Sequence, residues 1–445
     1  MSTVTEAPAF TLYPYQEEAV QAMEEERGFL LADEMGLGKT VVQMEELRRY
    51  TLTHSPTRSL IICPKSVISV WEDHAKKFGF KDVYLHHAPQ KAEHLITITN
   101  WDQIRINPMY KKVGWHFVVA DEAHNAKNRK AKRTRALWTI PARHRRALTG
   151  SPIVNRPDEL WAILHWLYPE RWTSYWKFYE KYVDYEKHPF HQYRIVKGAK
   201  NVEDLQEKLS MLMLRRFKRD VLTQLPDKYY EKIQVDLSPR QFAVYEQMRK
   251  DMLAWVGKNE DKPLAAKMVI AQLMRLRQIA GGTPDIDEEG NVTIHEPSSK
   301  IDALMDVIEG TDRPIVVFSN FRAMVRMVRE RCNAGKISCV GLTGETAQSD
   351  RSEAIRAFQA GEARVFVGTI RAGGVGVTLT RSSTVVFLDR SWSPADNLQA
   401  EDRLHRIGQE NAVQVIHIDA NRTVDRYVEA KLDWKWSIIK QILGG

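Results

Sequence analysis

A glycine-rich segment near the start of the chain has the composition of a phosphate-binding loop. It lies between an apolar run typical of a strand, Phe29–Ala32, and a run that predicts a helix, Val41–Tyr50. Its glycines let backbone N–H groups approach an anion, Lys39 can reach the β- and γ-phosphates, and the Thr40 hydroxyl can bind Mg²⁺. The predicted nucleotide-binding residues of this loop are Asp33, Glu34, Met35, Gly36, Leu37, Gly38, Lys39 and Thr40.

Two adjacent carboxylates follow another apolar run. Asp121 and Glu122 open the sequence Asp-Glu-Ala-His directly after Phe117–Ala120, so we expect them at the end of a strand. A carboxylate there can reach a metal ion held by Thr40, which makes Thr40 and Asp121 the predicted metal ligands. Glu122 is placed to orient or deprotonate an attacking water.

Two arginines near the C-terminus, Arg403 and Arg406, lie three residues apart. On a helix they would share one face, so both guanidinium groups could reach a single anion. A phosphate loop, a metal-binding carboxylate and a distant arginine pair predict an NTPase that closes two lobes over its nucleotide. The predicted catalytic residues are Lys39, Asp121, Glu122, Arg403 and Arg406.

Short apolar runs alternate with longer mixed segments in both halves of the chain, which predicts parallel sheets covered by helices. The runs of the first half are Phe29–Ala32, Leu60–Cys63, Leu95–Thr99, Phe117–Ala120 and Arg146–Thr149. Those of the second half are Ile315–Ser319, Ile337–Leu342, Arg364–Gly368, Val385–Asp389 and Val413–Ile418. Their polar or glycine-containing ends are where open α/β sheets bind ligands.

The segments between these runs predict further elements. Residues 155–215 are predicted to be helical, with their many tryptophans used for packing. Tyr229–Leu237 indicates a crossing strand or linker, and Gly281–Pro297, which follows a helical stretch, indicates a surface loop. The periodicity of Thr423–Leu443 predicts a helix that packs across the second lobe.

The composition is that of a soluble globular protein. The chain has 445 residues, a net charge of +8, 43% hydrophobic and 27% charged residues. The three cysteines, Cys63, Cys332 and Cys339, lack the spacing of a zinc site or disulfide scaffold, and Cys63 is read as core. No signal peptide and no apolar run of membrane-spanning length is found. We therefore expect a soluble intracellular protein, in the cytoplasm of a microbe or of a virus-infected host cell.

These segments, in this order, closely resemble the Swi/Snf-type ATPases of helicase superfamily two, from about residue 11 to about residue 440. The matching segments outside the phosphate loop are Tyr13–Gln16, Leu60–Pro64, Ile98–Trp101, Asp121–His124, Leu148–Ile153, Leu214–Val221, Leu225–Lys228, Ile315–Ser319, Thr369–Thr378 and Gln399–Gln409. The resemblance implies two RecA-like lobes with parallel sheets, joined by helical insertions. The form of the family that the chain resembles is a compact one, without accessory reader domains.

The resemblance also implies domain limits. An N-terminal lobe would occupy residues 1–225, with an insertion at about 155–215. A C-terminal lobe would occupy residues 226–445, with an insertion at about 238–300.

By the same resemblance, Gln16 would contact the adenine of ATP, and Arg403 and Arg406 would be arginine fingers. Thr149 and Ser151 would couple the nucleotide site to DNA. Gln399 and Gln409 are also expected to couple the nucleotide site to DNA, and Gly374 and Gly376 are expected to bind the nucleotide. The implied cofactors are ATP and Mg²⁺.

Three positions depart from common patterns. Asp33 stands where the general phosphate loop has glycine, as it does in this family. Ser151 replaces the usual threonine and keeps the hydroxyl, whereas Ile370 interrupts the usual Ser/Thr-Arg-Ala-Gly-Gly segment.

Several residues at predicted strand ends could contact nucleic acid without reading its sequence. They are Lys65, Asn100, Asn320, Thr343, Thr369, Arg371 and Trp392. Trp392 is equally well explained as a half-buried core residue. The basic run Arg129–Arg146 could bind phosphates or be a solvated basic helix, and the sequence favours neither.

The leading hypothesis is a monomeric ATP-dependent translocase on double-stranded DNA, a DNA-dependent ATPase that remodels DNA or protein–DNA complexes. One alternative is a strand-separating or annealing helicase at forks. Another is a nucleotide-gated DNA-binding scaffold without productive turnover, against which the intact catalytic set argues.

Overall fold

The computed structural model describes residues 11–54, 56–85, 95–187, 194–222, 224–258, 265–286, 292–373 and 377–443. The chain divides into two compact units. The first comprises Met1–Thr223 and Lys435–Gly445, and the second comprises Gln224–Trp434.

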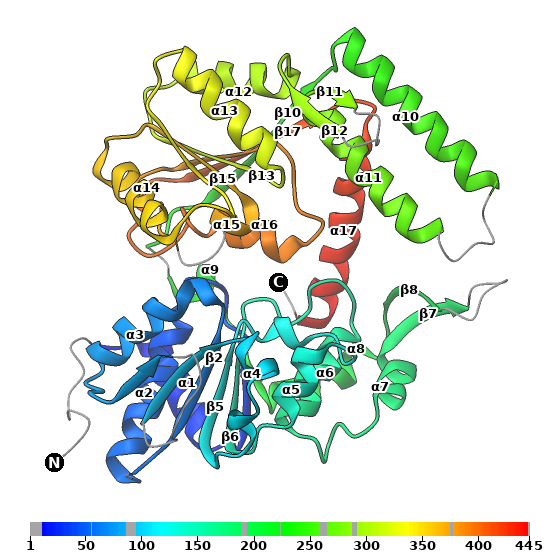
Figure 1. Ribbon diagram of the computed structural model, residues 1–445. Helices are drawn as coiled ribbons and strands as arrows, with labels where there is room; N and C mark the ends of the chain where they lie inside the picture. Colours follow the sequence, from blue (N-terminus) through cyan, green and yellow to red (C-terminus); the bar gives the residue numbers. More distant parts are fainter. Residues whose placement is uncertain are drawn as a thin grey trace. The chain divides into compact units, whose positions relative to one another are not determined.

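The first unit contains a seven-stranded sheet in which every described pairing is parallel (Figure 1). In spatial order its strands are β3 (Val83–Leu85), β4 (Ile96–Asn100), β2 (Ser59–Cys63), β5 (Trp115–Asp121), β6 (Ala142–Leu148), β1 (Gly28–Leu31) and β9 (Met213–Leu214). The five predicted strands correspond to β1, β2, β4, β5 and β6. The edge strands β3 and β9, three and two residues long, are too short to give an apolar run.

Helices connect these strands. They are α1 (Pro14–Glu24), α2 (Lys39–Thr53), α3 (Ile68–Lys77), α4 (Gln103–Ile106), α5 (Lys132–Trp138), α6 (Glu159–Leu167), α7 (Tyr175–Tyr182), α8 (Val202–Ser210) and α9 (Lys218–Val221). Three short 3₁₀ helices, η1 (Lys65–Val67), η2 (Pro108–Lys111) and η3 (Ala123–Ala126), follow strand ends or loops. Pro14 at the first turn suits the start of α1, and the Ser174 hydroxyl accepts the Lys177 N–H at the start of α7.

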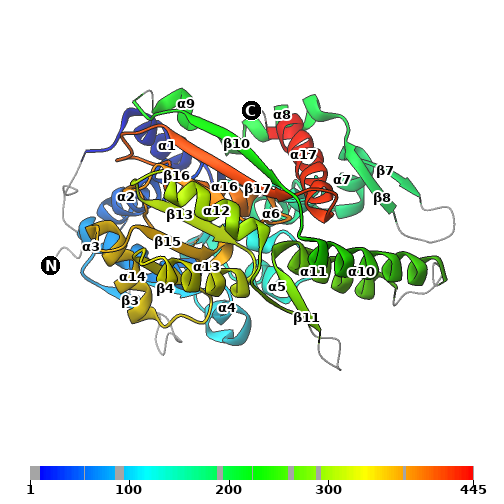
Figure 2. The same cartoon turned by 90° about the horizontal axis from the view of Figure 1, so that it is seen from above.

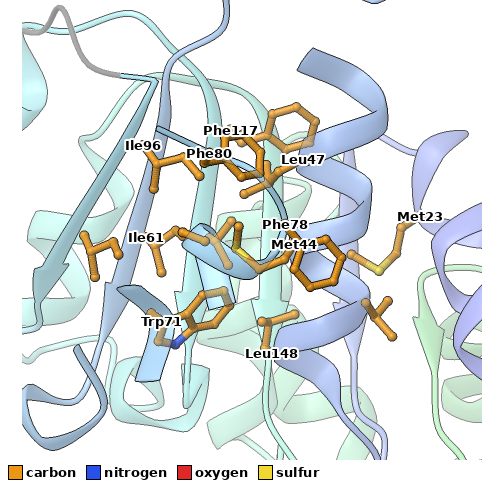
Figure 3. Packing of buried hydrophobic residues seen from close by; sticks show 14 of the residues in the cluster. Met23, Met44, Leu47, Ile61, Trp71, Phe78, Phe80, Ile96, Phe117 and Leu148 are labelled. Carbon is orange, nitrogen blue, oxygen red and sulfur yellow. The ribbon is translucent and has the colours of Figure 1, made fainter. Parts of the chain in front are cut away.

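The core of the first unit lies between the sheet and its helices (Figure 3). Met44 and Leu47 from α2 and Trp71 from α3 pack on the strand residues Ile61 and Phe117, all of them buried. Burial of a large apolar side chain stabilises the fold by about 1.5–3 kcal/mol. This packing fixes the strand ends that carry the site.

The insertion at residues 155–215 is not entirely helical, contrary to the prediction. Between α7 and α8 the chain forms an antiparallel hairpin of β7 (Val183–Lys187) and β8 (Arg194–Ala199), which extends beyond α7 (Figure 1). Its strands carry alternating aromatic, aliphatic and charged residues, a pattern without a continuous apolar run. The tryptophans pack as predicted at Trp161 and Trp166, whereas Trp176 is 54% exposed.

The second unit contains a six-stranded sheet in which every described pairing is also parallel. In spatial order its strands are β10 (Lys228–Val235), β17 (Val413–Ala420), β16 (Thr384–Phe387), β13 (Ile315–Ser319), β15 (Val365–Thr369) and β14 (Cys339–Leu342). The long strands β10 and β17 lie side by side in Figure 2. The predicted α/β class with two parallel sheets is confirmed.

The helices of the second unit are α10 (Pro239–Lys258), α11 (Ala265–Gly281), α12 (Ser299–Glu309), α13 (Arg322–Ala334), α14 (Gln348–Ala360), α15 (Ile370–Gly373), α16 (Pro394–Glu401) and α17 (Val424–Leu443). The consecutive helices α10 and α11 contact each other and lie side by side (Figure 1). Among the described residues, none of the helices combines the length and apolar character that crossing a membrane requires.

In the second half one prediction is wrong and another is incomplete. The segment Gly281–Pro297 contains an antiparallel hairpin of β11 (Thr283–Ile286) and β12 (Val292–His295), because Ile294 is buried against α13 and orders the segment. The helix α17 is helical as predicted, but only its first part belongs to the second unit, because the residues from Lys435 onward belong to the first. Lys435 Nζ donates to Asn155 Oδ1 at 2.8 Å, and Gln206 donates to the Gln441 carbonyl at 2.9 Å.

Candidate active site

The phosphate loop runs from the end of β1 to the start of α2, as predicted. Gly36 and Gly38 have φ angles of +88° and +81°, in the left-handed region that favours glycine. A Cβ atom at Gly38 would lie 2.4 Å from Gln16 Nε2, so a larger residue there would also have to displace the end of the Gln16 side chain. Gln16 comes from α1, is buried, and donates to the Leu37 carbonyl at 3.1 Å. The structure therefore brings Gln16 to the loop.

Lys39 and Thr40 are half-buried at the first turn of α2. Lys39 Nζ donates to the carbonyls of Asp33 at 2.7 Å and Glu34 at 3.2 Å, which holds its ammonium group against the loop. Met35 packs closely on Gly150, in the segment after β6. A Cβ atom added at Gly150 would lie only 2.8 Å from Met35 Cγ.

The carboxylate of Asp33 is only 1% exposed and binds Arg216. Its Oδ1 accepts from the Arg216 N–H at 3.0 Å and from Nε at 3.1 Å, and its Oδ2 accepts from Nη2 at 2.5 Å. Glu34 Oε2 similarly accepts from the Lys218 N–H at 2.7 Å. Both acidic side chains at the start of the loop therefore bind the segment after β9, and their nucleotide contacts stay a prediction.

Asp121 ends β5, as the sequence predicts, and Trp71 holds its side chain. Trp71 Nε1 donates to Asp121 Oδ2 at 2.8 Å, and the Glu122 N–H donates to Oδ1 at 2.9 Å. Burial of the carboxyl group and the neighbouring Glu122 raise the pKa of Asp121 to about 7, against the lowering effects of Trp71 and Lys39. Leu31 at the end of β1 and Asp121 at the end of β5 both pair with Leu148 of β6, so the phosphate loop and the acidic box lie at the same edge of the sheet.

Glu122 has a φ angle of +50°, an uncommon left-handed conformation for a residue other than glycine. Its Oε2 lies 3.3 Å from His124 Nδ1, and the same nitrogen lies 3.0 Å from Thr149 Oγ1. Thr149 Oγ1 also accepts from the Ser151 N–H at 3.1 Å. A chain of polar contacts thus links the acidic box to the two predicted coupling residues after β6.

These residues fit a bound Mg²⁺–nucleotide. Gly36 and Gly38 adopt left-handed φ angles and have no side chain that would keep an anion from the backbone N–H groups of the loop. Lys39 supplies a cation at the loop, and Thr40 and Asp121 supply oxygen atoms of the kind Mg²⁺ prefers. The sequence did not assign roles to Trp71, Arg216 and His124. Arg216 and His124 lie inside segments that match the family, and that position in the sequence could have indicated a role for them.

Arg403 and Arg406 do not share a helix face, contrary to the prediction, because α16 ends at Glu401 and both lie in the turns after it. They nevertheless converge on one segment. Arg403 Nη1 donates to the Val377 carbonyl at 3.4 Å, and Arg406 Nη1 donates to Thr378 Oγ1 at 3.0 Å. Burial lowers the pKa of Arg406 from its ordinary value.

The predicted coupling residue Gln409 is buried and donates to the carbonyls of Thr380, Ser382 and Leu404 at 2.8–3.2 Å. It therefore orders the chain that carries the two arginines. Gln399 is half-buried, and its carbonyl accepts from Arg403 Nε at 3.2 Å. Gly374 and Gly376 lie outside the described residues.

The predicted nucleic-acid residues of the first unit lie at strand ends. Lys65 is exposed at the start of η1. Asn100 Oδ1 accepts the N–H groups of Asp102 at 3.0 Å and Gln103 at 3.2 Å, so its amide group orders the start of α4.

Those of the second unit differ in accessibility. Arg371 is exposed, Thr343 is half-buried and Thr369 is buried. Asn320 Nδ2 donates to Asp389 Oδ1 at 2.5 Å. Trp392 is half-buried, with the Arg277 guanidinium 5.2 Å from its ring centroid, which favours the packing alternative.

The basic run Arg129–Arg146 is not one helix. It contains α5 and part of β6, and Arg146 is fully buried in an ion pair with Glu46, with Nη2 and Oε1 2.5 Å apart. Only the first part of the run, through Arg135, presents several exposed basic side chains.

Comparison with known proteins identifies two domains. The SNF2-related domain matches residues 15–282, and the helicase conserved C-terminal domain matches residues 299–408. The chain is 28% identical to the Sulfolobus solfataricus SWI2/SNF2 ATPase core in complex with dsDNA, with a TM-score of 0.47, and the match covers 98% of this chain and 94% of that one.

Curated relatives match over most of the chain. The "Uncharacterized ATP-dependent helicase MG018" of Mycoplasma genitalium is 31% identical over 97% of this chain and 42% of its own length. The human SWI/SNF-related matrix-associated actin-dependent regulator of chromatin subfamily A member 1 is 29% identical over 91% of this chain and 41% of its own. The chain thus spans less than half the length of these relatives. The predicted family is confirmed: the chain belongs to the SNF2-related family.

Proposed function

We propose that this chain is a DNA-dependent ATPase that moves along double-stranded DNA and remodels DNA or protein–DNA complexes. The observation that carries the proposal is the arrangement in the first unit, where the loop between β1 and α2 presents Lys39 and the end of β5 presents Asp121 and Glu122. The membership of the SNF2-related family supports it.

Each residue has a distinct chemical task in this proposal. Lys39 and the loop N–H groups would bind the phosphates of ATP. Thr40 and Asp121 would hold Mg²⁺, which would supply positive charge to the phosphate oxygens. Glu122 accepts the proton of the attacking water. His124 lies between Glu122 Oε2 and Thr149 Oγ1, so it links this base indirectly to the segment after β6.

Arg403 and Arg406 are the proposed arginine fingers. Their guanidinium groups would stabilise the charge that develops on the transferred phosphoryl group. Because both residues belong to the second unit and the phosphate loop to the first, hydrolysis would require the two units to act together.

The duplex is the proposed track because the family resemblance implies movement along DNA without strand separation. A motor that follows the backbone depends on phosphate contacts, which carry no sequence information. Such contacts weaken steeply with salt, because each neutralised phosphate releases counterions.

The test is an ATPase assay with no nucleic acid, single-stranded DNA, duplex DNA and RNA in parallel, repeated over a salt series. We expect duplex DNA to stimulate most, whatever its sequence, and Lys39→Ala to abolish turnover. Lys76→Ala, an exposed lysine of α3, is the matched control and should leave turnover unchanged. Better stimulation by single strands, with efficient opening of forks, would favour the helicase alternative. The absence of any turnover would favour the scaffold.

A further inference from the structure

A pocket of about 690 Å³ lies on the first unit outside the nucleotide-binding loop. Its walls come from the segment after η3, the segment before α6, the helix α7 and the strand β8, and α7 adjoins the β7–β8 hairpin in both views (Figure 1, Figure 2). A volume of this size suits a small organic group such as a nucleotide.

The pocket is rich in cations. Its basic lining residues are Lys127, Arg129, Lys130, Arg156 and Arg194. The two lining carboxylates are already paired, Asp158 with Arg156 at 2.7 Å and Glu159 with Lys127 at 3.6 Å. Arg129 and Lys130 have no carboxylate partner within the described part of the chain. The pocket therefore offers unneutralised positive charge to an anion.

Aromatic rings lie beside these cations. The Arg129 guanidinium lies 4.0 Å from the Tyr175 ring centroid, and the Arg194 guanidinium lies 4.9 Å from that of Trp176. Tyr175 is half-buried, whereas Trp176 is 54% exposed. Exposed aromatic rings beside cations are the usual means by which proteins bind unpaired bases together with their phosphates.

A third feature concerns Asp158, which is 6% exposed. Its Oδ2 accepts from Arg156 and from the Tyr175 hydroxyl at 2.9 Å, but its buried Oδ1 has no hydrogen-bond partner among the described residues. A buried carboxylate oxygen requires a donor. The N–H groups on the edge of a base can supply one.

The pocket is also connected to the candidate active site. Lys127 directly follows η3, which begins after Glu122, and Asn155 lies four residues after Ser151. The hydrogen bond between His124 and Thr149 joins these two segments. A ligand in the pocket would thus contact the continuation of both segments.

We propose that this pocket binds an unpaired nucleotide of a single-stranded DNA segment adjoining the duplex. Arg129 and Lys130 bind its phosphate, Trp176 stacks on its base, and Asp158 accepts a base N–H. The proposal rests on the proposed function, since it adds a contact to the DNA along which the chain moves.

The experiment measures binding of the full chain to a fluorescent blunt duplex and to the same duplex with a short single-stranded tail. We expect the tail to raise the affinity of the wild-type chain. Trp176→Ala should weaken tailed-duplex binding by about 5- to 150-fold, the range for loss of one stacked base, and leave blunt-duplex binding unchanged. Trp176→Phe should retain most of the preference, and Arg129→Ala should lower the salt slope for the tailed duplex by about one.

Lys177→Ala is the matched control, an exposed neighbour on α7 that does not line the pocket. The proposal is overturned if wild type binds both duplexes equally, or if Trp176→Ala weakens both equally, which would indicate a duplex contact. It is also overturned if polyglutamate displaces the tailed duplex as well as oligothymidylate does, which would indicate a general anion site. Stimulation of the wild-type ATPase by blunt duplex tests the proposed function separately. Trp176→Ala should keep that stimulation, because the pocket is proposed to contact only the single-stranded tail.

Discussion

Asp33 and Arg216, 183 residues apart in the sequence, form a two-point ion pair at the start of the phosphate loop. Arg216 also donates to the carbonyl of Tyr15 in α1. The loop is thereby fixed from both sides, by a helix that precedes it and by the segment that follows the edge strand β9. This explains in physical terms why an aspartate stands at the position where the general loop has glycine.

Arg216→Ala should therefore destabilise the first unit and weaken ATP binding. Removing one partner of a buried ion pair leaves the other charge unpaired, at a cost of about 3–5 kcal/mol. Urea unfolding and nucleotide titration would measure the two effects. Arg219→Ala is the matched control, because Arg219 is 71% exposed and its ion-pair partner is its neighbour Asp220. Equal stability of the two variants would contradict the structural role assigned to Arg216.

The central strands and the phosphate loop could be predicted from the sequence because their signals are local. Buried parallel strands are continuous apolar runs, and the loop is a short motif between a strand and a helix. The β7–β8 hairpin could not be predicted in the same way. Its order depends on pairing between the two strands, in which Tyr185 lies opposite Val196 and Lys187 opposite Arg194. The sequence of each strand mixes aromatic and charged residues as α7 does, so it does not by itself indicate a strand.

The partners of the site residues depend on the fold, not on spacing. Trp71 lies 50 residues before Asp121 and reaches it only because β2 and β5 are neighbours in the sheet. The prediction that Arg403 and Arg406 lie on one helix was wrong for a related reason. The turns after α16 are ordered by long-range contacts such as those of Gln409, which no local periodicity reveals.

Trp71→Phe should keep the packing of α3 but remove the N–H that holds Asp121 Oδ2. Loss of a group that orients a metal ligand typically costs about 10- to 100-fold in metal affinity. We expect the Mg²⁺ concentration for half-maximal ATPase activity to rise within that range. Thermal stability should fall about as much as in a control that shortens another buried tryptophan, because both changes leave a cavity. Trp115→Phe is the control, since Trp115 Nε1 donates to the Tyr110 carbonyl instead. An unchanged Mg²⁺ requirement would mean that Trp71 does not position Asp121.

Glu122→Gln should leave ATP binding largely intact and stop hydrolysis, since it removes a proton acceptor but not the metal ligand. General base catalysis contributes about 10²–10⁴-fold, so turnover should fall by that factor. Single-turnover hydrolysis and fluorescent-nucleotide binding separate the two steps. Glu72→Gln is a suitable control, because Glu72 is a half-buried glutamate of α3 in the same unit and pairs with the exposed Lys76. Full activity of Glu122→Gln would remove Glu122 from the proposed mechanism.

Arg406→Ala tests whether the second unit completes the active site. In the structure Arg406 donates to Thr378 Oγ1, a contact that holds its guanidinium beside the segment also contacted by Arg403. An arginine finger contributes about 10³–10⁵ to turnover in related NTPases. Nucleotide affinity should therefore stay within a few-fold of wild type, because the phosphate loop lies in the other unit, while DNA-stimulated hydrolysis is almost lost.

Arg426→Ala, an exposed arginine of α17, is the matched control and should behave as wild type. Thr378→Val, which removes the hydroxyl but keeps Arg406, should give an intermediate loss, because the guanidinium remains but is less well ordered. Wild-type turnover by Arg406→Ala would show that hydrolysis does not depend on this arginine, and the two-unit mechanism would then be wrong.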